Sequence, residues 1–145
     1  MLSTSPLMGN GAITVALAGP VGRSARWMGI LMIEAWRTTS IPGYEVSDQG
    51  RVRRVAGGRG ARAGRILQCW ISSRGYVMAS LSNCGQSKHY RVHRLVTSAF
   101  MGPVPAGFQV NHRNGKKTDN RLSNLEYVSP RENIRHAIAH SLFGS

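Results

Sequence analysis

The chain has 145 residues, which is enough for one small domain or two very small ones. Its net charge of +13 favours a polyanionic partner, and a nucleic acid before a membrane surface. The two cysteines, Cys69 and Cys84, exclude a disulfide framework and a four-cysteine zinc site, and no apolar run reaches the roughly 18 residues of a transmembrane helix.

The first 33 residues differ from the rest of the chain. They contain Arg23 and Arg26 but no lysine and no acid, and the mildly apolar run 12–17 follows no basic region. A signal peptide is therefore not expected. We expect residues 1–33 to be a disordered extension, and a true start at Met28 or Met32 is an equal alternative.

Residues 34–64 form the first predicted module. Two short alternating runs, 44–46 and 51–53, flank a Ser-Asp-Gln-Gly turn and predict a hairpin. The Gly- and Arg-rich run 56–64 has no periodicity and indicates a flexible basic loop. Three arginines around the hairpin suit contacts with phosphates, with a solvated surface hairpin as the alternative: Arg51, Arg53 and Arg54.

Residues 65–100 predict an antiparallel meander followed by a helix. The three runs with strand character are 65–71, 76–81 and 88–92, separated by turn residues. Their large apolar side chains, Trp70, Val77 and Leu81, are expected in the core. Residues 93–100 then have the apolar spacing of a short helix.

Residues 109–140 predict two strands joined by a polar loop and followed by a helix. The strands are 109–112 and 125–128, and the loop between them is rich in Asn, Gly, Lys and Asp. The next three residues, Ser129, Pro130 and Arg131, lead to Glu132 as in a capping box, which predicts a helix start. The apolar residues Ile134, Ala137, Ile138 and Leu142 are expected to form the packing face of that helix.

The pattern across this region resembles the His-Asn-His (HNH) endonucleases of the ββα-metal class, in particular their homing-endonuclease branch. That branch has a pattern similar to HRLV, AF, VNH, GxK, N, NL, V, EN and HA in this order. The matching positions here are 93–96, 99–100, 110–112, 115–117, 120, 124–125, 128, 132–133 and 136–137. The run from Trp36 to Arg53 also resembles the small NUMOD4 module that often precedes such nucleases.

The resemblance implies an α+β fold, with small antiparallel strands followed by a ββα-metal nuclease motif in residues 65–145. It implies that His112 is the general base and that Asn111 and Asn133 bind one divalent metal ion, Mg²⁺ or Mn²⁺. Asn124 is implied as a structural residue that ties the loop. One metal ion and one neutral histidine can together activate water and neutralise charge during phosphodiester hydrolysis.

Two features depart from a simple site of this kind. Many relatives have an aspartate where Asn111 stands, so this pair of amides carries no negative charge. Adjacent residues of a strand also point to opposite faces, so Asn111 and His112 serve one site only if the strand twists or ends there.

Four basic residues of the loop are expected to follow the DNA backbone, unless they are only a solvated loop: Arg113, Lys116, Lys117 and Arg121. His136 is expected either to contact a DNA phosphate or to pack within the protein.

The predicted function is therefore a metal-dependent endonuclease of phage or mobile-element type that hydrolyses double-stranded DNA. We expect a monomer in the cytoplasm with no membrane partner. The first alternative is a catalytically weak or inactive DNA-binding protein of the same fold. This alternative is considered because Asn111 replaces the aspartate of many relatives. The second is a ribosomal or RNA-binding structural protein, which has no reason to pair His112 with Asn133 at this spacing.

Overall fold

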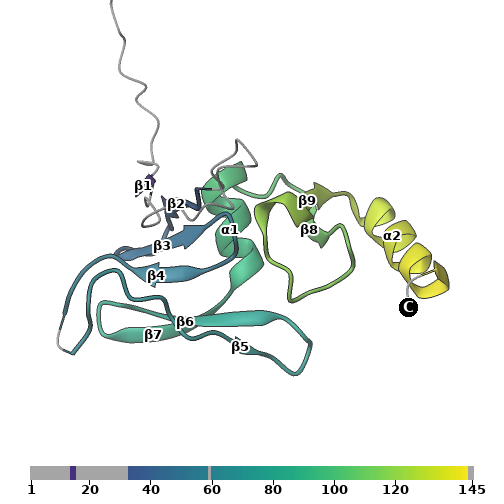
Figure 1. Cartoon of the computed structure of the whole chain (residues 1–145). Coiled ribbons are helices and arrows are strands. Elements are labelled where there is room, and N and C mark those ends of the chain that lie inside the picture. Colours follow the sequence, from purple (N-terminus) through teal and green to yellow (C-terminus); the bar gives the residue numbers. More distant parts are fainter. Residues whose placement is uncertain (1–13, 16–32, 59, 144–145) are drawn as a thin grey trace, which may run out of the picture.

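The computed structural model describes residues 14–15, 33–58 and 60–143 (Figure 1). In this part of the chain, short antiparallel strands form three small sheets, and they are accompanied by the helices α1 (Val92–Met101) and α2 (Pro130–Phe143). This arrangement confirms the predicted α+β class. Among the described residues, no helix has the length and apolar character needed to span a membrane.

The first sheet has the strand order β1-β2-β3-β4. Its strands are β1 (Thr14–Val15), β2 (Ala35–Thr38), β3 (Tyr44–Ser47) and β4 (Val52–Arg54). The predicted hairpin is thus present, and its turn is closed by a hydrogen bond of 3.0 Å from the Gly50 N–H to the Ser47 carbonyl. The disorder expected for residues 1–33 is not found at residues 14–15, which pair with β2. Residues 1–13 and 16–32 lie outside the described residues.

The second sheet contains β5 (Trp70–Ile71), β6 (Val77–Asn83) and β7 (Gln86–Arg91). The predicted strand 65–71 is mostly wrong, because only its last two residues join this sheet. Its start runs beside β4 instead, where the Leu67 N–H donates to the Val52 carbonyl at 2.8 Å. The core position predicted for Trp70 is also wrong. This residue is 40% exposed, since it lies on an edge strand with its ring edge against the His89 ring.

Helix α1 joins the three sheets, and Figure 1 shows it between the β2–β4 strands and the β8–β9 hairpin. Its buried face packs against side chains from the first sheet, the second sheet and β9. The buried apolar cluster consists of Ile41, Tyr44, Val46, Val52, Ala79, Leu81, Val92, Leu95, Val96 and Leu125. Residues on both sides of the predicted boundary at residue 64 therefore contribute to one core.

The third sheet is the hairpin of β8 (Gln109–His112) and β9 (Leu125–Val128), which leads into α2. The loop between the strands ends in the short 3-10 helix η2 (Leu122–Asn124). The predicted capping box is confirmed: the Ser129 N–H donates to Glu132 Oε2 at 2.8 Å, and the Glu132 N–H donates to Ser129 Oγ at 3.3 Å. The order strand, loop, strand, helix is as predicted.

The predicted packing face of α2 is wrong. Ile134, Ile138 and Leu142 are 61%, 52% and 69% exposed. The polar stripe of the helix faces the hairpin instead: Asn133 bonds to Gln109, and His140 Nε2 lies 3.1 Å from the Arg113 carbonyl oxygen. Because α2 extends away from the rest of the protein after β9 (Figure 1), its apolar side chains have no surface to pack on within the described residues.

Candidate active site

His112 is the last residue of β8, and it is buried with 6% of its surface exposed. Its Nε2 lies 3.0 Å from Asn120 Oδ1. An amide oxygen can only accept a hydrogen bond, so Nε2 carries the hydrogen and Nδ1 keeps its lone pair. Nδ1 has no protein partner and is not among the fully buried unpaired nitrogens of the described residues, so it retains access to solvent. This is the arrangement that a histidine base requires.

Asn120 is held in place by the first sheet. It is 5% exposed, and the β3–β4 turn packs directly against it. A Cβ atom on Gly50 would lie 2.9 Å from Asn120 Cβ. Beside this contact, the Leu122 N–H donates to the Asp48 carbonyl at 2.8 Å. The turn of the N-terminal hairpin therefore supports the loop that orients His112.

Asn124 ties the same loop together through both atoms of its amide. Its Oδ1 accepts from the Asn114 N–H at 3.0 Å. Its Nδ2 donates to the Asp119 carbonyl at 2.8 Å and to Asn114 Oδ1 at 2.9 Å. These contacts are those expected of a residue that fixes the loop rather than one that contacts the reacting groups.

His93 and Tyr76 form an aromatic wall behind His112. The ring centroids of His93 and His112 are 5.0 Å apart in an edge-on arrangement, and those of His93 and Tyr76 are 5.1 Å apart. Burial, the neighbouring His112 and two arginines lower the pKa of His93 to about 3. His93 is thus neutral at physiological pH and adds no charge that would oppose protonation of His112.

Asn111 contacts a different set of residues, because adjacent side chains of β8 alternate in direction. It is 8% exposed, and its Nδ2 donates to Glu126 Oε1 at 2.9 Å across the hairpin. Arg113, two residues further on, places its Nε 3.3 Å from Glu126 Oε2. Asn111, Glu126 and Arg113 therefore share one face of the hairpin.

Asn133 joins this face from the first turn of α2. Its Nδ2 donates to Gln109 Oε1 at 2.8 Å, and Gln109 lies two residues before Asn111 on the same side of β8. The structure thus brings Asn111 and Asn133 to the same side of the hairpin. The contacts of His112 with Asn120 and His93 lie on the other side, so the two sets can serve one site only at the end of β8, where His112 is the last residue.

The residues on the α2 side have the donor atoms that a hard divalent cation prefers. No cluster of three His, Cys, Asp or Glu side chains suited to a metal ion occurs in the described part of the chain, so amide oxygens would have to contribute. Asn111 and Asn133 both donate through Nδ2, and their Oδ1 atoms accept no hydrogen bond from the described residues. Oxygen ligands of this kind suit Mg²⁺ or Mn²⁺.

The candidate DNA-binding arginines of the first sheet are partly engaged within the protein. Arg53 forms an ion pair with Glu45 at 2.6 Å, and its guanidinium lies 4.1 Å from the centre of the Trp36 ring. Arg51 is paired with Glu34. Arg54 donates to the Ala56 carbonyl at 3.1 Å. Arg51 remains exposed at the surface, whereas Arg53 is largely covered.

The basic residues of the β8–β9 loop are exposed, but they differ in their partners. Arg121 donates twice to Asp119, at 2.8 and 2.7 Å, and this pairing holds the pKa of Asp119 at about 2. The Lys116 ammonium has no ion-pair partner among the described residues. Lys117 Nζ lies 4.8 Å from the centre of the Tyr76 ring. His136 on α2 packs against the His140 ring, with centroids 4.6 Å apart.

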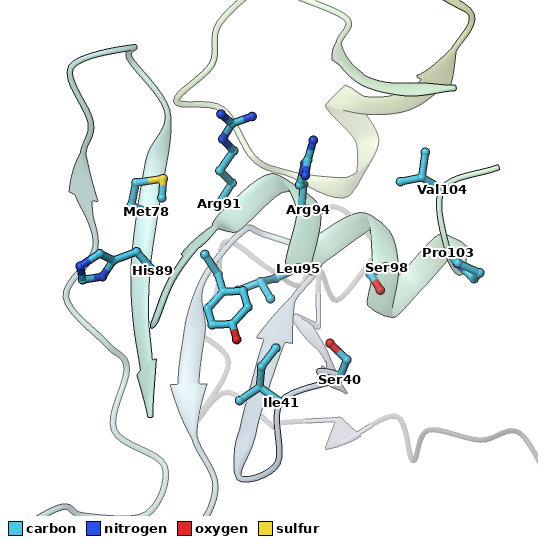
Figure 2. A pocket seen from close by; sticks show the side chains of 11 residues that line it. Ser40, Ile41, Met78, His89, Arg91, Arg94, Leu95, Ser98, Pro103 and Val104 are labelled. Carbon is cyan, nitrogen blue, oxygen red and sulfur yellow. The ribbon is translucent and has the colours of Figure 1, made fainter. Parts of the chain in front are cut away.

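Arg91 and Arg94 are basic residues near the site that the sequence reasoning did not assign to DNA. Both line an open groove of about 690 Å³ between the second sheet and α1, and Figure 2 shows their side chains extending to the same side. The Arg91 guanidinium lies 4.7 Å from the centre of the Tyr76 ring, which Lys117 also contacts. Tyr76 and Glu126 were also missed as site residues, and Asn120 was matched only as a motif position, because their roles depend on contacts that the sequence pattern does not contain.

Comparisons with known proteins agree with this geometry. The family model described as HNH endonuclease matches residues 90–135. An uncharacterized HNH endonuclease of Acanthamoeba polyphaga mimivirus is 34% identical over 77% of this chain and 32% of its own length. The SPbeta prophage-derived putative HNH homing endonuclease YosQ of Bacillus subtilis is 40% identical over 48% of this chain and 40% of its own.

The DNA endonuclease I-HmuI of Bacillus phage SP01 is 30% identical over 66% of this chain and 52% of its own length. A solved structure, described as "DNA binding and cleavage by the HNH homing endonuclease I-HmuI", aligns with a TM-score of 0.63 and 27% identity, over 76% of this chain and 61% of that one. The chain spans about half or less of the length of these curated relatives. Residues 90–135 therefore match the HNH endonuclease family model, and they belong to a fold similar to that of I-HmuI.

Proposed function

We propose that this chain is a metal-dependent DNA endonuclease of the HNH homing type, with His112 as its general base. The observation that carries the proposal is the hydrogen bond of 3.0 Å between His112 Nε2 and Asn120 Oδ1, which leaves Nδ1 as a base open to solvent. The likeness to I-HmuI supports DNA as the substrate, since that protein is described as binding and cleaving DNA.

In the proposed reaction, Nδ1 of His112 removes a proton from the attacking water, and Asn120 keeps the ring in the correct tautomer. Asn111 and Asn133 would hold one Mg²⁺ or Mn²⁺ ion through their amide oxygens. When bound, the ion supplies positive charge at the phosphate and at the leaving oxygen. The scissile phosphate would lie at the end of β8, where one group can reach both the His112 side and the side of Asn111 and Asn133. Arg91 and Lys117, which flank Tyr76 beside His112, contribute further positive charge.

The duplex would extend from this point over the basic surface. We assign backbone contacts to the exposed cations of the β8–β9 loop, to His136 and to the arginines of the β3–β4 hairpin. Residues 34–64 would act as a NUMOD4-like module that helps to position the DNA. We propose that the protein acts as a monomer in the cytoplasm, where its two free cysteines, Cys69 and Cys84, stay reduced.

A plasmid-nicking assay tests the proposal. The purified protein should convert supercoiled plasmid to nicked or linear DNA with Mg²⁺ or Mn²⁺, and chelation of the metal should stop the reaction. His112→Ala should lower the cleavage rate by about 10²–10⁴-fold, because it removes the base. DNA binding, measured separately by fluorescence anisotropy, should remain near the wild-type level.

The matched control is His89→Ala, which removes an exposed histidine of β7 that has no assigned role in the site. It should cleave like the wild type. The amide at position 111 favours the second candidate, a DNA-binding protein that cleaves weakly or not at all. Tight DNA binding without cleavage at any concentration of Mg²⁺ or Mn²⁺ would support that candidate and contradict the first.

A further inference from the structure

We propose that Glu126 supplies the negative charge for the divalent metal ion that Asn111 lacks. This inference rests on the proposed function, because it places Glu126 beside the metal ligands assigned there. Among the groups on the α2 face of the hairpin, Glu126 is the acid in direct contact with a candidate ligand, through the hydrogen bond of 2.9 Å from Asn111 Nδ2 to its Oε1.

The position of Glu126 follows from the register of the hairpin. Asn111 pairs with Glu126 across β8 and β9, and directly opposite residues in an antiparallel pair have neighbouring side chains on the same face. The same face holds Gln109, to which Asn133 is bonded. The carboxylate therefore lies on the side of the hairpin that carries both amide ligands, and away from the side on which His112 contacts Asn120.

The hydrogen bond between Asn111 and Glu126 also orients the amide. Since Asn111 Nδ2 donates to the carboxylate, Oδ1 is turned away from it and left without a protein donor among the described residues. A cation that takes an amide oxygen and a carboxylate oxygen from these opposite strands would replace this hydrogen bond, with Oδ1 turned to the metal side. Glu126 is only partly exposed, with 29% of its side chain accessible, so its charge is screened less than that of a fully exposed acid.

Arg113 competes with the cation for this carboxylate. Its Nε lies 3.3 Å from Glu126 Oε2, and its own side chain is 60% exposed. An exposed ion pair of this length is weak, and it can open when a divalent ion or a DNA phosphate offers a better partner. Arg113 then moves to the DNA backbone as the metal ion occupies the carboxylate.

Direct titration of the DNA-free protein with Mn²⁺, followed through the electron paramagnetic resonance signal of the free ion, tests this inference without measuring activity. Glu126→Gln keeps the shape and the contact with Asn111 but removes the charge. It should weaken Mn²⁺ binding by about 10–100-fold. The control is Glu34→Gln, which makes the same change in another Arg–Glu pair, that of Glu34 with Arg51 in the first sheet. It should bind Mn²⁺ as the wild type does.

Two further variants separate a metal role from a structural one. Arg113→Gln breaks the same ion pair as Glu126→Gln, yet it should strengthen Mn²⁺ binding, because it removes the competing cation. If Glu126 served only the ion pair, the two variants would behave alike. Adding Asn111→Asp to Glu126→Gln returns one carboxylate to the pair and should restore most of the lost affinity. Circular dichroism of each variant shows whether the hairpin is still folded.

The outcomes distinguish this inference from the proposed function. If Asn111→Ala and Asn133→Ala lose Mn²⁺ binding while Glu126→Gln keeps wild-type affinity, the role of Glu126 is overturned and the metal site stands. If none of these three variants changes Mn²⁺ binding, the metal site itself is absent from this face. If Glu126→Gln loses binding and the double variant regains it, Glu126 is part of the site.

Discussion

At the scale of single residues, the orientation of His112 depends on one amide. Asn120→Ala removes the acceptor for Nε2, so the ring can change tautomer and rotate. We expect DNA cleavage to fall by about 10²-fold, as when a reacting group is misplaced by a small distance. The ring ¹⁵N chemical shifts of His112 should also change from those of one tautomer to those of a mixture.

The control for this variant is Asn83→Ala, which truncates an exposed amide near the β6–β7 turn. It should leave both the cleavage rate and the His112 shifts unchanged. A single, unaltered tautomer in Asn120→Ala, together with a wild-type rate, would show that the backbone alone positions His112.

His93 links the site to acid stability. Its pKa of about 3 in the folded protein lies below the ordinary value of 6.5, so the unfolded chain binds the proton first as the pH falls. The stability that neutral His93 contributes is therefore complete above pH 6.5 and is lost progressively as the pH decreases toward 3. His93→Phe should flatten this part of the pH dependence of the free energy of unfolding, measured by urea denaturation at several pH values. The exposed control His89→Phe should keep the wild-type slope.

At the scale of elements, the β3–β4 turn supports the active-site loop, and this contact provides a test with a built-in control. Gly50 and Gly85 both have a φ of +79° in hairpin turns, but a Cβ on Gly50 would meet Asn120 at 2.9 Å, whereas one on Gly85 meets nothing within 4 Å. Gly85→Ala should destabilise the protein by about 1 kcal/mol, through backbone conformation alone. Gly50→Ala should add about 1–3 kcal/mol from the clash.

Because the clash of Gly50→Ala falls on Asn120, this variant should also lower the cleavage rate, whereas Gly85→Ala should not. Thermal unfolding and plasmid nicking measure the two effects. Equal loss of stability in both variants, with normal cleavage, would mean that the loop does not depend on the N-terminal hairpin.

Elements with a local signal are predictable from sequence, and those decided by packing are not. The helix start at Ser129 follows from a capping box of adjacent residues, and this prediction is confirmed. The strand predicted for residues 65–71 is mostly wrong, because its first three residues pair with β4 through hydrogen bonds that no local pattern reveals. The prediction for the apolar stripe of α2 is wrong for a similar reason: its spacing is that of a packing face, but the helix turns its polar stripe to the hairpin.

The site residues divide in the same way. His112, Asn111, Asn124 and Asn133 could be selected because they occupy positions in an ordered motif. Glu126 enters only through the cross-strand register of β8 and β9, and Asn120, although it occupies a position of the motif, acquires a role only through its contact with the imidazole. Such contacts depend on the distance between side chains, which the sequence pattern does not contain.

At the scale of the whole molecule, the two predicted modules share one core. Tyr44 in β3 accepts a hydrogen bond at its hydroxyl from the Ser82 N–H at 3.0 Å, and its ring belongs to the same buried cluster as Leu81 and Val96. The predicted boundary at residue 64 reflects a change in composition, namely a glycine-rich basic loop between two patterned regions. Composition reports where the chain is irregular, and it does not report which side chains pack together across that point.

The charge of the whole molecule leads to the last prediction. From residue 34 onward, the chain contains 17 of its 19 Lys and Arg residues, since Arg23 and Arg26 precede this point. Four of the 17 are held in ion pairs within the described residues, and exposed cations among the others, such as Lys116, can contact phosphates. With about six to ten phosphate contacts, DNA affinity should fall by about 10³–10⁵-fold between about 50 and 200 mM salt.

Single variants show which cations take part in this salt dependence. Lys116 has an exposed ammonium without an ion-pair partner among the described residues, so Lys116→Gln should reduce the slope of log affinity against log salt concentration by about 1. Arg121 forms two hydrogen bonds to the Asp119 carboxylate. Arg121→Gln should reduce the slope by less, because this arginine must break its contact with Asp119 before it can bind a phosphate. Fluorescence anisotropy at four or more salt concentrations measures both slopes. An affinity independent of salt would contradict binding through phosphate contacts altogether. Equal slopes in wild type and both variants would exclude Lys116 and Arg121 from the DNA contact and leave the arginines of the first sheet and α1 as the binding surface.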